Sequence, residues 1–413
     1  MRQLAFWLAT VPLLVASALG FAHQPLDEQS SSMGDPRRFM HGIGAANGAG
    51  DDVQLFFSRS SLPPDAEDSP APWSHDIYIA PWNPASGELG SSRVFIGKSE
   101  AQEPVSVAQN VRGQIMLTLE DGWKAKHGVT QRYGIYDQNL EPIHPYPAEV
   151  EPGGHSGHVA AVGDLFVVVY SDGWVDFGGQ DNLGSGKGVY AKIYDEAGTE
   201  LHDVDIVHAK RAWWPVVAGG KTNALVAWQQ LDARGKAASL EVALIDPVSG
   251  SVGPTTVLHD EVQYYTYSAR WLAALERFLV VGTADGYGFA RLIDSSGRIT
   301  AALSCLPATV REAGIAVQDK SLPKGVTYAY TPAANGQLMQ LRAKPDSLEW
   351  SGLLAAHDGK AVSWHPVGSL GLFASSGELH WFSLTPRGLE QIRFDPARVA
   401  APDEEASSKS CSK

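Results

Sequence analysis

Short apolar runs recur along the chain, each five to seven residues long and each ended by Gly, Asn or Asp. They are rich in Val, Leu, Tyr and Phe, as in residues 165–170 (LFVVVY), 224–230 (ALVAWQQ) and 277–282 (RFLVVG). Runs of this length and composition, bounded by turn residues, are typical of β-strands. No stretch after residue 22 shows a sustained apolar period of 3.6 residues. The pattern therefore predicts an all-β protein.

A turn segment repeats between these runs: a strand residue, an Asp or Asn, a turn with Gly, and a second short strand. Its seven copies begin at residues 82, 136, 194, 245, 293, 344 and 384, at successive spacings of 54, 58, 51, 48, 51 and 40 residues. A period of about 50 residues with four strands per repeat is typical of propeller blades. The repeats predict one seven-bladed β-propeller of four-stranded antiparallel blades over residues 38–395. Six or eight blades are the alternatives, if the long insert of the first blade hides the count.

Each predicted blade runs from an innermost strand a to an outermost strand d, and the repeated turn joins c to d. The predicted inner strands are rich in small residues, as in residues 42–46 (GIGAA), 157–162 (GHVAAV) and 216–220 (VVAGG). Small side chains suit strands that crowd around a central channel, so these segments are expected to line it.

The N-terminal sequence predicts export. A short basic segment, Met1-Arg2-Gln3, precedes an apolar stretch over residues 4–20 that ends in small residues. This is the pattern of a signal peptide, here residues 1–22, and no later segment is apolar enough to cross a membrane. We expect a periplasmic or secreted protein of a Gram-negative bacterium that is not a transmembrane protein. Residues 23–37 and the polar tail 396–413 are expected to be loose.

The composition agrees with this fold and argues against a nucleic-acid partner. Gly 42 and Pro 25 make 67 of 413 residues, about 16% against an average near 12%, as a chain with many turns requires. Lys+Arg 32 against Asp+Glu 46 gives a net charge of −14. Because Lys and Arg supply most of the affinity for nucleic acid, we expect no nucleic-acid partner. We expect a monomer.

The chain has two cysteines, Cys305 and Cys411. In an oxidising compartment they could pair as a single disulfide that ties the polar tail to the propeller, and the sequence leaves this open.

The third repeat resembles a known repeat. Residues 165–201 contain VVVYSDG followed by GSGKGVYAKIYDEAGTEL. This is similar to the repeat of many exported bacterial β-propellers, in which a strand is followed by an Asp/Gly-rich loop and a GVYA–x–x–YD–x–x–G hairpin. The resemblance implies the fold and an extracytoplasmic location. It implies no activity, because such repeats occur in proteins of many functions.

Loop length suggests where a ligand would bind. The predicted b–c loops are long in blades one to four (residues 58–75, 120–132, 171–188 and 229–239) and short in blades five to seven (283–288, 331–336 and 375–378). Long loops on one side of a rigid scaffold are where binding groups accumulate. The d–a segments open on the same face, so we expect the site there, over blades one to four.

An Asp-Gly-aromatic motif recurs in these loops and contains Trp123, Trp174 and Tyr287. One interpretation is a tight turn in which Asp binds its own backbone and Gly takes a positive φ. The other is that Trp123 and Trp174 form a stacking platform for sugar rings.

The loop of the third blade carries carboxylates among glycines: Asp172, Asp176 and Asp181. Oxygen ligands on a flexible loop suit Ca²⁺, although the EF-hand alternation and its closing Glu are missing. Calcium is therefore a candidate ligand, a solvated polar loop is the alternative, and no other cofactor is expected.

The d–a segments are predicted to point a mixed set of side chains into the funnel. The ligand-binding candidates among them are His155, His158, Arg211, Trp213, Tyr267, Arg270 and Arg311. Aromatic rings mixed with Arg and His suit an anionic or glycan ligand. Trp213 could instead fill a gap between blades, and His155 with His158 could bind a transition metal only from a loop, since residues three apart on a strand face opposite sides.

Three functions fit the sequence. The leading hypothesis is an exported binding or assembly module that recognises a glycan or an exported partner protein on the face described above. The alternative is a glycan-active hydrolase or lyase with carboxylates and His in the funnel. A metal-bearing oxidoreductase is the third. The sequence leaves open whether the protein is an enzyme, because no known catalytic motif occurs in it.

Overall fold

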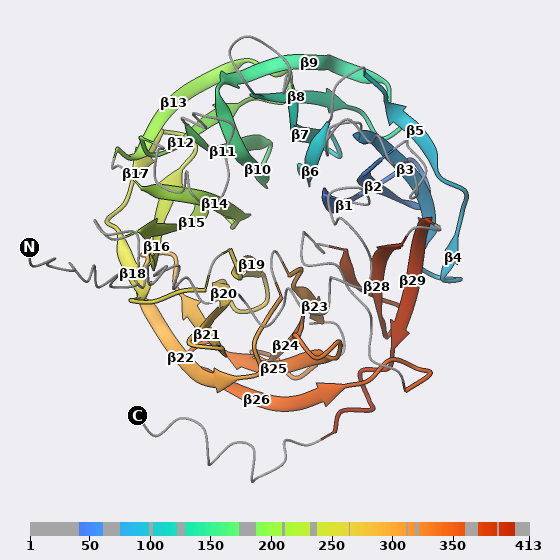
Figure 1. Cartoon of the computed structure of the whole chain (residues 1–413), viewed down its shortest axis with the longest axis vertical. Helices are drawn as coiled ribbons and strands as arrows, with labels where there is room; N and C mark the ends of the chain where they lie inside the picture. Colours follow the sequence, from blue (N-terminus) through green and yellow to red (C-terminus); the bar gives the residue numbers. More distant parts are fainter. Residues whose placement is uncertain are drawn as a thin grey trace, which may run out of the picture.

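The computed structural model shows a ring of β-sheets around a central axis (Figure 1). It describes residues 41–60, 75–98, 102–121, 129–172, 187–208, 211–231, 238–263, 265–310, 313–318, 322–359, 371–385 and 388–400. Seven antiparallel sheets follow one another around the ring in sequence order. The predicted all-β, seven-bladed propeller is confirmed. Within the described residues there is no helix, and so none long and apolar enough to span a membrane.

The first three blades occupy the N-terminal half of the ring. Blade one contains β1 (His41–Asn47), β2 (Val53–Ser60), β3 (His75–Asn83), β4 (Glu88–Leu89) and β5 (Arg93–Ile96). Blade two contains β6 (Glu103–Gln109), β7 (Ile115–Asp121), β8 (Thr130–Tyr136) and β9 (Pro142–Pro152). Blade three contains β10 (Gly154–Val162), β11 (Leu165–Asp172), β12 (Val189–Tyr194) and β13 (Glu200–Val207).

The next three blades repeat this order. Blade four contains β14 (Ala212–Gly219), β15 (Ala224–Leu231), β16 (Ala238–Asp246), β17 (Ser251–Val252) and β18 (Thr256–His259). Blade five contains β19 (Ser268–Leu272), β20 (Arg277–Ala284), β21 (Tyr287–Ile293) and β22 (Ile299–Leu306). Blade six contains β23 (Ala316–Gln318), β24 (Thr327–Pro332), β25 (Leu338–Lys344) and β26 (Ser347–Leu354). In blades one and four the outer strand is interrupted, so β4 with β5 and β17 with β18 share the fourth position.

Blade seven contains β27 (Leu372–Ser375), β28 (Glu378–Thr385) and β29 (Gly388–Phe394), three strands among the described residues. The hairpin between β27 and β28 turns at Ser376 (φ 53°) and Gly377 (φ 82°). The b–c hairpin of blade five turns in the same way at Asp285 (φ 50°) and Gly286 (φ 78°). β27 and β28 therefore correspond to strands b and c, and residues 360–370, which precede them, lie outside the described residues.

The core lies between the blades rather than within them, because each sheet buries both faces against its neighbours. Between blades three and four, Val169 and Ala191 pack with Val226 and Trp228, all with no exposed surface. A sheet buried on both faces needs apolar residues at nearly every position of its middle strands, and the apolar runs of the sequence supply them.

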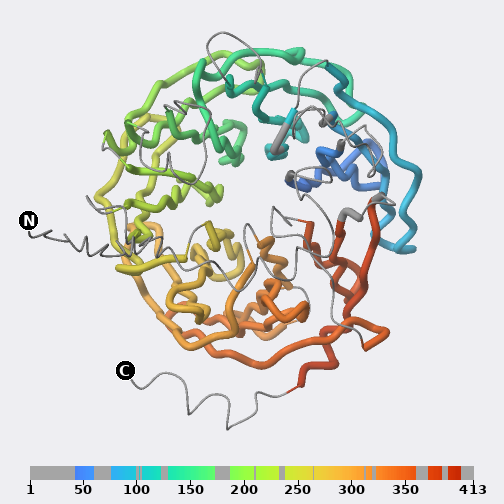
Figure 2. The backbone as a smooth tube through the Cα atoms, viewed as in Figure 1, coloured from blue at the N-terminus to red at the C-terminus, as the bar shows by residue number. Residues whose placement is uncertain are grey.

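The last blade closes the ring against the first, and Figure 2 shows the two ends of the colour scale side by side. Trp82 at the end of β3 packs against Phe382 and His380 of β28, with ring centroids 5.0 and 4.9 Å apart. The Ser376 hydroxyl adds a hydrogen bond of 3.1 Å to the Pro84 carbonyl oxygen.

Candidate functional site: the central channel

The innermost strands enclose a channel of about 670 Å³. It is lined by β1, β6, β10, β14, β19 and β23 and by β27 of blade seven. Most of the lining is Gly, Ala and Val. Gly219 shows why: a Cβ added there would lie 2.0 Å from the Ala161 carbonyl oxygen of the neighbouring blade. The volume of the channel is in the range of known ligand pockets.

A group of polar residues lies at one level of this channel. In each of blades two to five, one residue begins the regular pairing of the inner strand with the next strand. These residues hold equivalent positions in their blades, and they are Ser106, His158, Val216 and Ser268. Three of the four are polar and line the channel. The inner strands of blades two, three and four start at the face that carries the b–c loops, so this level lies towards that mouth.

Arg270 lies one step deeper. Two residues further along each inner strand, blades two, three and four have Ala108, Ala160 and Ala218, whereas blade five has Arg270. Arg270 is the only Lys, Arg, Asp or Glu among the described residues that line the channel. Its side chain is exposed to the channel, and partial desolvation by the surrounding ring lowers the pKa of the guanidinium. No described residue forms an ion pair or hydrogen bond with it.

At the opposite end of the inner strands of blades one and two, the side-chain amides of Asn47 and Gln109 are paired with each other. Gln109 accepts hydrogen bonds from the backbone and side-chain nitrogens of Asn47 at 2.9 Å each. Its own NH₂ group donates to the carbonyl oxygens of Asn47 and Gly113, at 2.9 and 3.0 Å. These amides join blades one and two, whereas Ser106, His158 and Ser268 lie towards the other mouth.

Three of the predicted site residues lie in the packing between blades. Trp213 and Tyr267 are each 1% exposed, and Tyr267 donates a hydrogen bond of 2.5 Å to the Trp214 carbonyl oxygen. His155 is buried with its ring centroid 5.8 Å from that of Trp213. Inter-blade packing, the alternative stated for Trp213, is the arrangement seen here. Arg211 lies directly before β14 in the positive-φ region (φ 73°), and its carbonyl oxygen accepts from the Leu231 amide.

His155 and Ser156 do form a polar cluster, but its geometry is that of an inter-blade contact. The Glu120 carboxylate accepts a hydrogen bond from the Ser156 backbone amide and lies 3.3 Å from His155 Nδ1. The same Nδ1 also faces the Ser156 hydroxyl. In a catalytic Ser–His–acid triad the two ring nitrogens serve the two partners separately. Here a single nitrogen faces both partners, which differs from the triad arrangement.

The calcium candidates are only partly described. Asp172 ends β11, and its carboxylate accepts a hydrogen bond of 2.8 Å from the Lys187 amide across the neck of the loop. Asp176 and Asp181 lie outside the described residues, as do Trp123, Trp174 and Arg311. Among the residues that the structure does describe, no three His, Cys, Asp or Glu side chains gather as metal ligands.

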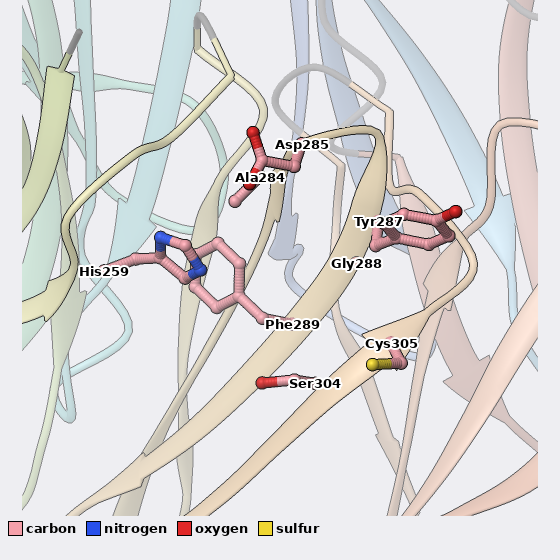
Figure 3. Close-up of a pocket in the computed structure, with 8 residues that line it drawn as sticks. All are labelled: His259, Ala284, Asp285, Tyr287, Gly288, Phe289, Ser304 and Cys305. Atoms are coloured by element: carbon pink, nitrogen blue, oxygen red, sulfur yellow. The ribbon is translucent and has the colours of Figure 1, made fainter. Parts of the chain in front are cut away.

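A second, smaller cavity of about 140 Å³ lies beside the short b–c hairpin of blade five (Figure 3). His259 lies against Phe289, with ring centroids 4.9 Å apart, and burial lowers the pKa of its imidazole, helped by the nearby Arg291. Asp285 and Ser304 also line this cavity. No hydrogen bond in the described part of the chain joins His259 to either, and the volume is below that of a ligand pocket.

Cys305 lines the same cavity and is disulfide-bonded. The sequence contains one other cysteine, Cys411, which lies outside the described residues.

Two channel residues, Ser106 and Ser268, were not among the sequence candidates. A serine in a strand of small residues does not by itself indicate a binding site. The pairing register within each blade shows that both serines hold the same position as His158. His158 and Arg270 were both candidates, and the structure brings them into one channel.

Comparison with known proteins supports the fold but does not assign the chain to a family. No protein-family model matches the chain, and no curated protein sequence matches it. Solved structures do match: the BP39L lectin from Burkholderia pseudomallei has a TM-score of 0.57 at 12% identity, over 85% of this chain and 95% of the lectin.

Two other solved structures cover most of the chain at similarly low identity. Kuenenia stuttgartiensis hydrazine synthase gives a TM-score of 0.52 at 11% identity, covering 86% of this chain and 96% of the matched one. A chain of the mitotic checkpoint complex gives 0.50 at 13% identity, with 96% and 98% covered. At such identities the similarity establishes a β-propeller and nothing about activity.

Proposed function

We propose that this protein is an exported binding module that holds a glycan in the mouth of its central channel, on the face that carries the b–c loops. The observation that carries the proposal is the channel itself: about 670 Å³, lined by small apolar residues, with a few polar groups that converge from separate blades. This combination is typical of ligand sites. The fold similarity to a lectin supports the choice of a glycan.

Binding is favoured over glycan hydrolysis by the composition of the lining. Retaining and inverting glycosidases use a pair of carboxyl groups that flank the scissile bond. The described lining residues contain no Asp or Glu, while they do contain Ser106, His158, Ser268 and Arg270, which can hydrogen-bond to a ligand.

The N-terminal sequence supports export to the periplasm or the medium, as does the repeat in residues 165–201. Fractionation of cells that express the full chain is expected to find the processed protein outside the cytoplasm. Retention of the unprocessed chain in the cytoplasm would contradict this part of the proposal.

The binding proposal is tested by titrating the purified protein with neutral and acidic oligosaccharides in a calorimeter. We expect at least one saccharide to bind, and Trp123→Ala and Trp174→Ala to weaken binding by about tenfold if these rings stack on the sugar. Trp350→Ala, a half-buried tryptophan on outer strand β26, is the matched control and is expected to bind normally. If no saccharide binds the wild-type protein, glycan recognition is wrong.

A further inference from the structure

Arg270 occupies a position at which three other blades have alanine. At the equivalent level, blades two, three and four have Ala108, Ala160 and Ala218. Alanine is what the crowding of the inner strands favours. An arginine here places a permanent positive charge in the channel of a protein whose net charge is −14.

This charge is enclosed and has no partner among the described residues. The guanidinium is exposed to the channel that the ring surrounds, and partial desolvation there lowers its pKa. Even partial removal of a cation from bulk water costs free energy when no anion pairs with it. An anion bound in the channel would offset that cost.

Ser268 supplies a second, independent observation. The residue is 6% exposed and lines the channel, and its buried hydroxyl oxygen has no hydrogen-bond partner among the described residues. Ser268 and Arg270 lie two residues apart on β19 and therefore on the same side of the strand, about 7 Å apart along it. An unsatisfied buried hydroxyl is uncommon in native proteins. Rotation of the side chain about χ1 towards the channel would bring this hydroxyl to a ligand oxygen.

His158 completes the set from blade three. Its Nδ1 donates a hydrogen bond of 3.1 Å to the Ser156 carbonyl oxygen, which leaves Nε2 to accept from a ligand hydroxyl. The Ser106 hydroxyl, level with His158 in blade two, accepts a bond of 3.1 Å from the Val159 amide and keeps its own proton for a ligand. Arginine, a buried hydroxyl and hydroxyl-binding groups together match a ligand that carries both an oxyanion and alcohols.

We infer that the channel binds an oxyanion, the carboxylate or sulfate of an acidic saccharide, with Arg270 and Ser268 holding the charged group. The saccharide part of this inference rests on the function proposed above, and the oxyanion part does not. Arginine's planar fork matches an oxyanion with two parallel hydrogen bonds, each stronger than a bond between neutral groups.

The test measures binding and thermal stability with four probes: glucuronate, glucose, inorganic sulfate and chloride, in a buffer without phosphate. We expect glucuronate and sulfate to bind and to raise the melting temperature, and glucose to bind more weakly than glucuronate. Added salt should weaken both interactions by screening. Equal binding of glucose and glucuronate would overturn the inference, and so would the absence of any response to glucuronate and sulfate.

Arg270→Ala is the informative variant because alanine already occupies this level in three other blades. We expect a loss of affinity for glucuronate and sulfate of about 10- to 100-fold, as for losing a hydrogen-bonded charge. Arg270→Lys keeps the positive charge but loses the planar guanidinium, so its affinity for these anions should lie between those of the wild type and Arg270→Ala. Without ligand, Arg270→Ala should be at least as stable as the wild type, since an unpaired enclosed charge is gone.

Arg93→Gln removes one positive charge from outer strand β5, where the residue is exposed, and serves as the matched control with unchanged binding. The outcomes separate the two proposals. If sugars bind but Arg270→Ala binds them normally, the oxyanion site is wrong and glycan binding stands. If sulfate binds through Arg270 while no saccharide binds more tightly than sulfate, the oxyanion site stands and the glycan function is wrong.

Discussion

In blades one to five, a single carboxylate or amide oxygen organises the c–d turn. This oxygen accepts a hydrogen bond from the backbone amide two residues further on and a second one from the amide three or four residues further on. The residues that supply it are Asn83, Asp137, Asp195, Asp246 and Asp294. This side-chain cap fixes the turn locally and needs no distant contact. The repeat was visible in the sequence for this reason.

The turn at Asp294 has the most hydrogen bonds and should make stability depend on pH. Burial would raise the pKa of this carboxyl, but hydrogen bonds from Ser296 and Arg298 outweigh it and hold the pKa well below its usual range. A lowered pKa in the folded state gives stability that is complete above the unfolded pKa of about 4 and is lost as pH falls towards the folded pKa.

Asp294→Ala should therefore lower stability by about 1–2 kcal/mol at neutral pH, and the difference from the wild type should shrink as the pH falls below about 4. Asp294→Asn is the control, since Asn83 shows that an amide can cap this turn. It should retain most of the stability at neutral pH. Urea denaturation at several pH values measures both, and a difference that is independent of pH would contradict the assignment.

At the scale of elements, neighbouring blades are joined by polar residues near the end of strand b. Glu120 in β7 accepts from the Ser156 amide, Gln229 in β15 from the Tyr265 amide at 3.2 Å, and Thr283 in β20 from the Thr309 amide at 2.8 Å. All three acceptors are buried. Each satisfies a backbone amide at the entrance to the next blade, where the chain leaves regular pairing.

Glu120→Ala should lower the free energy of unfolding by about 1–3 kcal/mol, because it leaves the buried Ser156 amide without this acceptor. Glu120→Gln should lose much less, since glutamine performs the same role at position 229. Glu88→Ala, at an exposed position on β4, is the control. If Glu120→Ala unfolds at the same denaturant concentration as Glu88→Ala, these side chains do not hold the blades together.

These contacts mark the limit of what the sequence could predict. Turns and small inner-strand residues are local patterns and were visible, whereas the register between blades is not local. Trp213 and Tyr267 were placed among the ligand-binding candidates because an aromatic residue in a d–a segment has the same pattern whether it faces a ligand or the next blade. The sequence could not show that Arg270 has no partner among the described residues, because that depends on how strands from separate blades are arranged around one axis.

At the scale of the whole molecule, the seam between blades one and seven decides whether the ring stays closed. The described contacts there are mostly aromatic, with Trp82 against Phe382, His380 and, at 6.0 Å, Phe373. Such rings contribute both buried area and favourable edge contacts.

Trp82→Ala should cost about 3–5 kcal/mol, the usual loss for emptying a buried aromatic site. Trp350→Ala, away from the seam, should cost much less. Amide hydrogen exchange locates the effect: strands β1 to β3 and β27 to β29 should lose protection first, while blades three to five keep theirs. Uniform loss of protection around the ring would show that the seam is not a separate weak point.

Each of blades two to six is built from one uninterrupted stretch of chain, from β6–β9 through to β23–β26. One blade therefore corresponds to one contiguous stretch of the gene. Duplication of such a stretch adds a complete blade with its own turn and its own contacts to both neighbours, and a deletion removes one cleanly. The lining of the channel is divided in the same way, so a substitution on the inner strand of one blade changes the chemistry of the channel without altering the other blades.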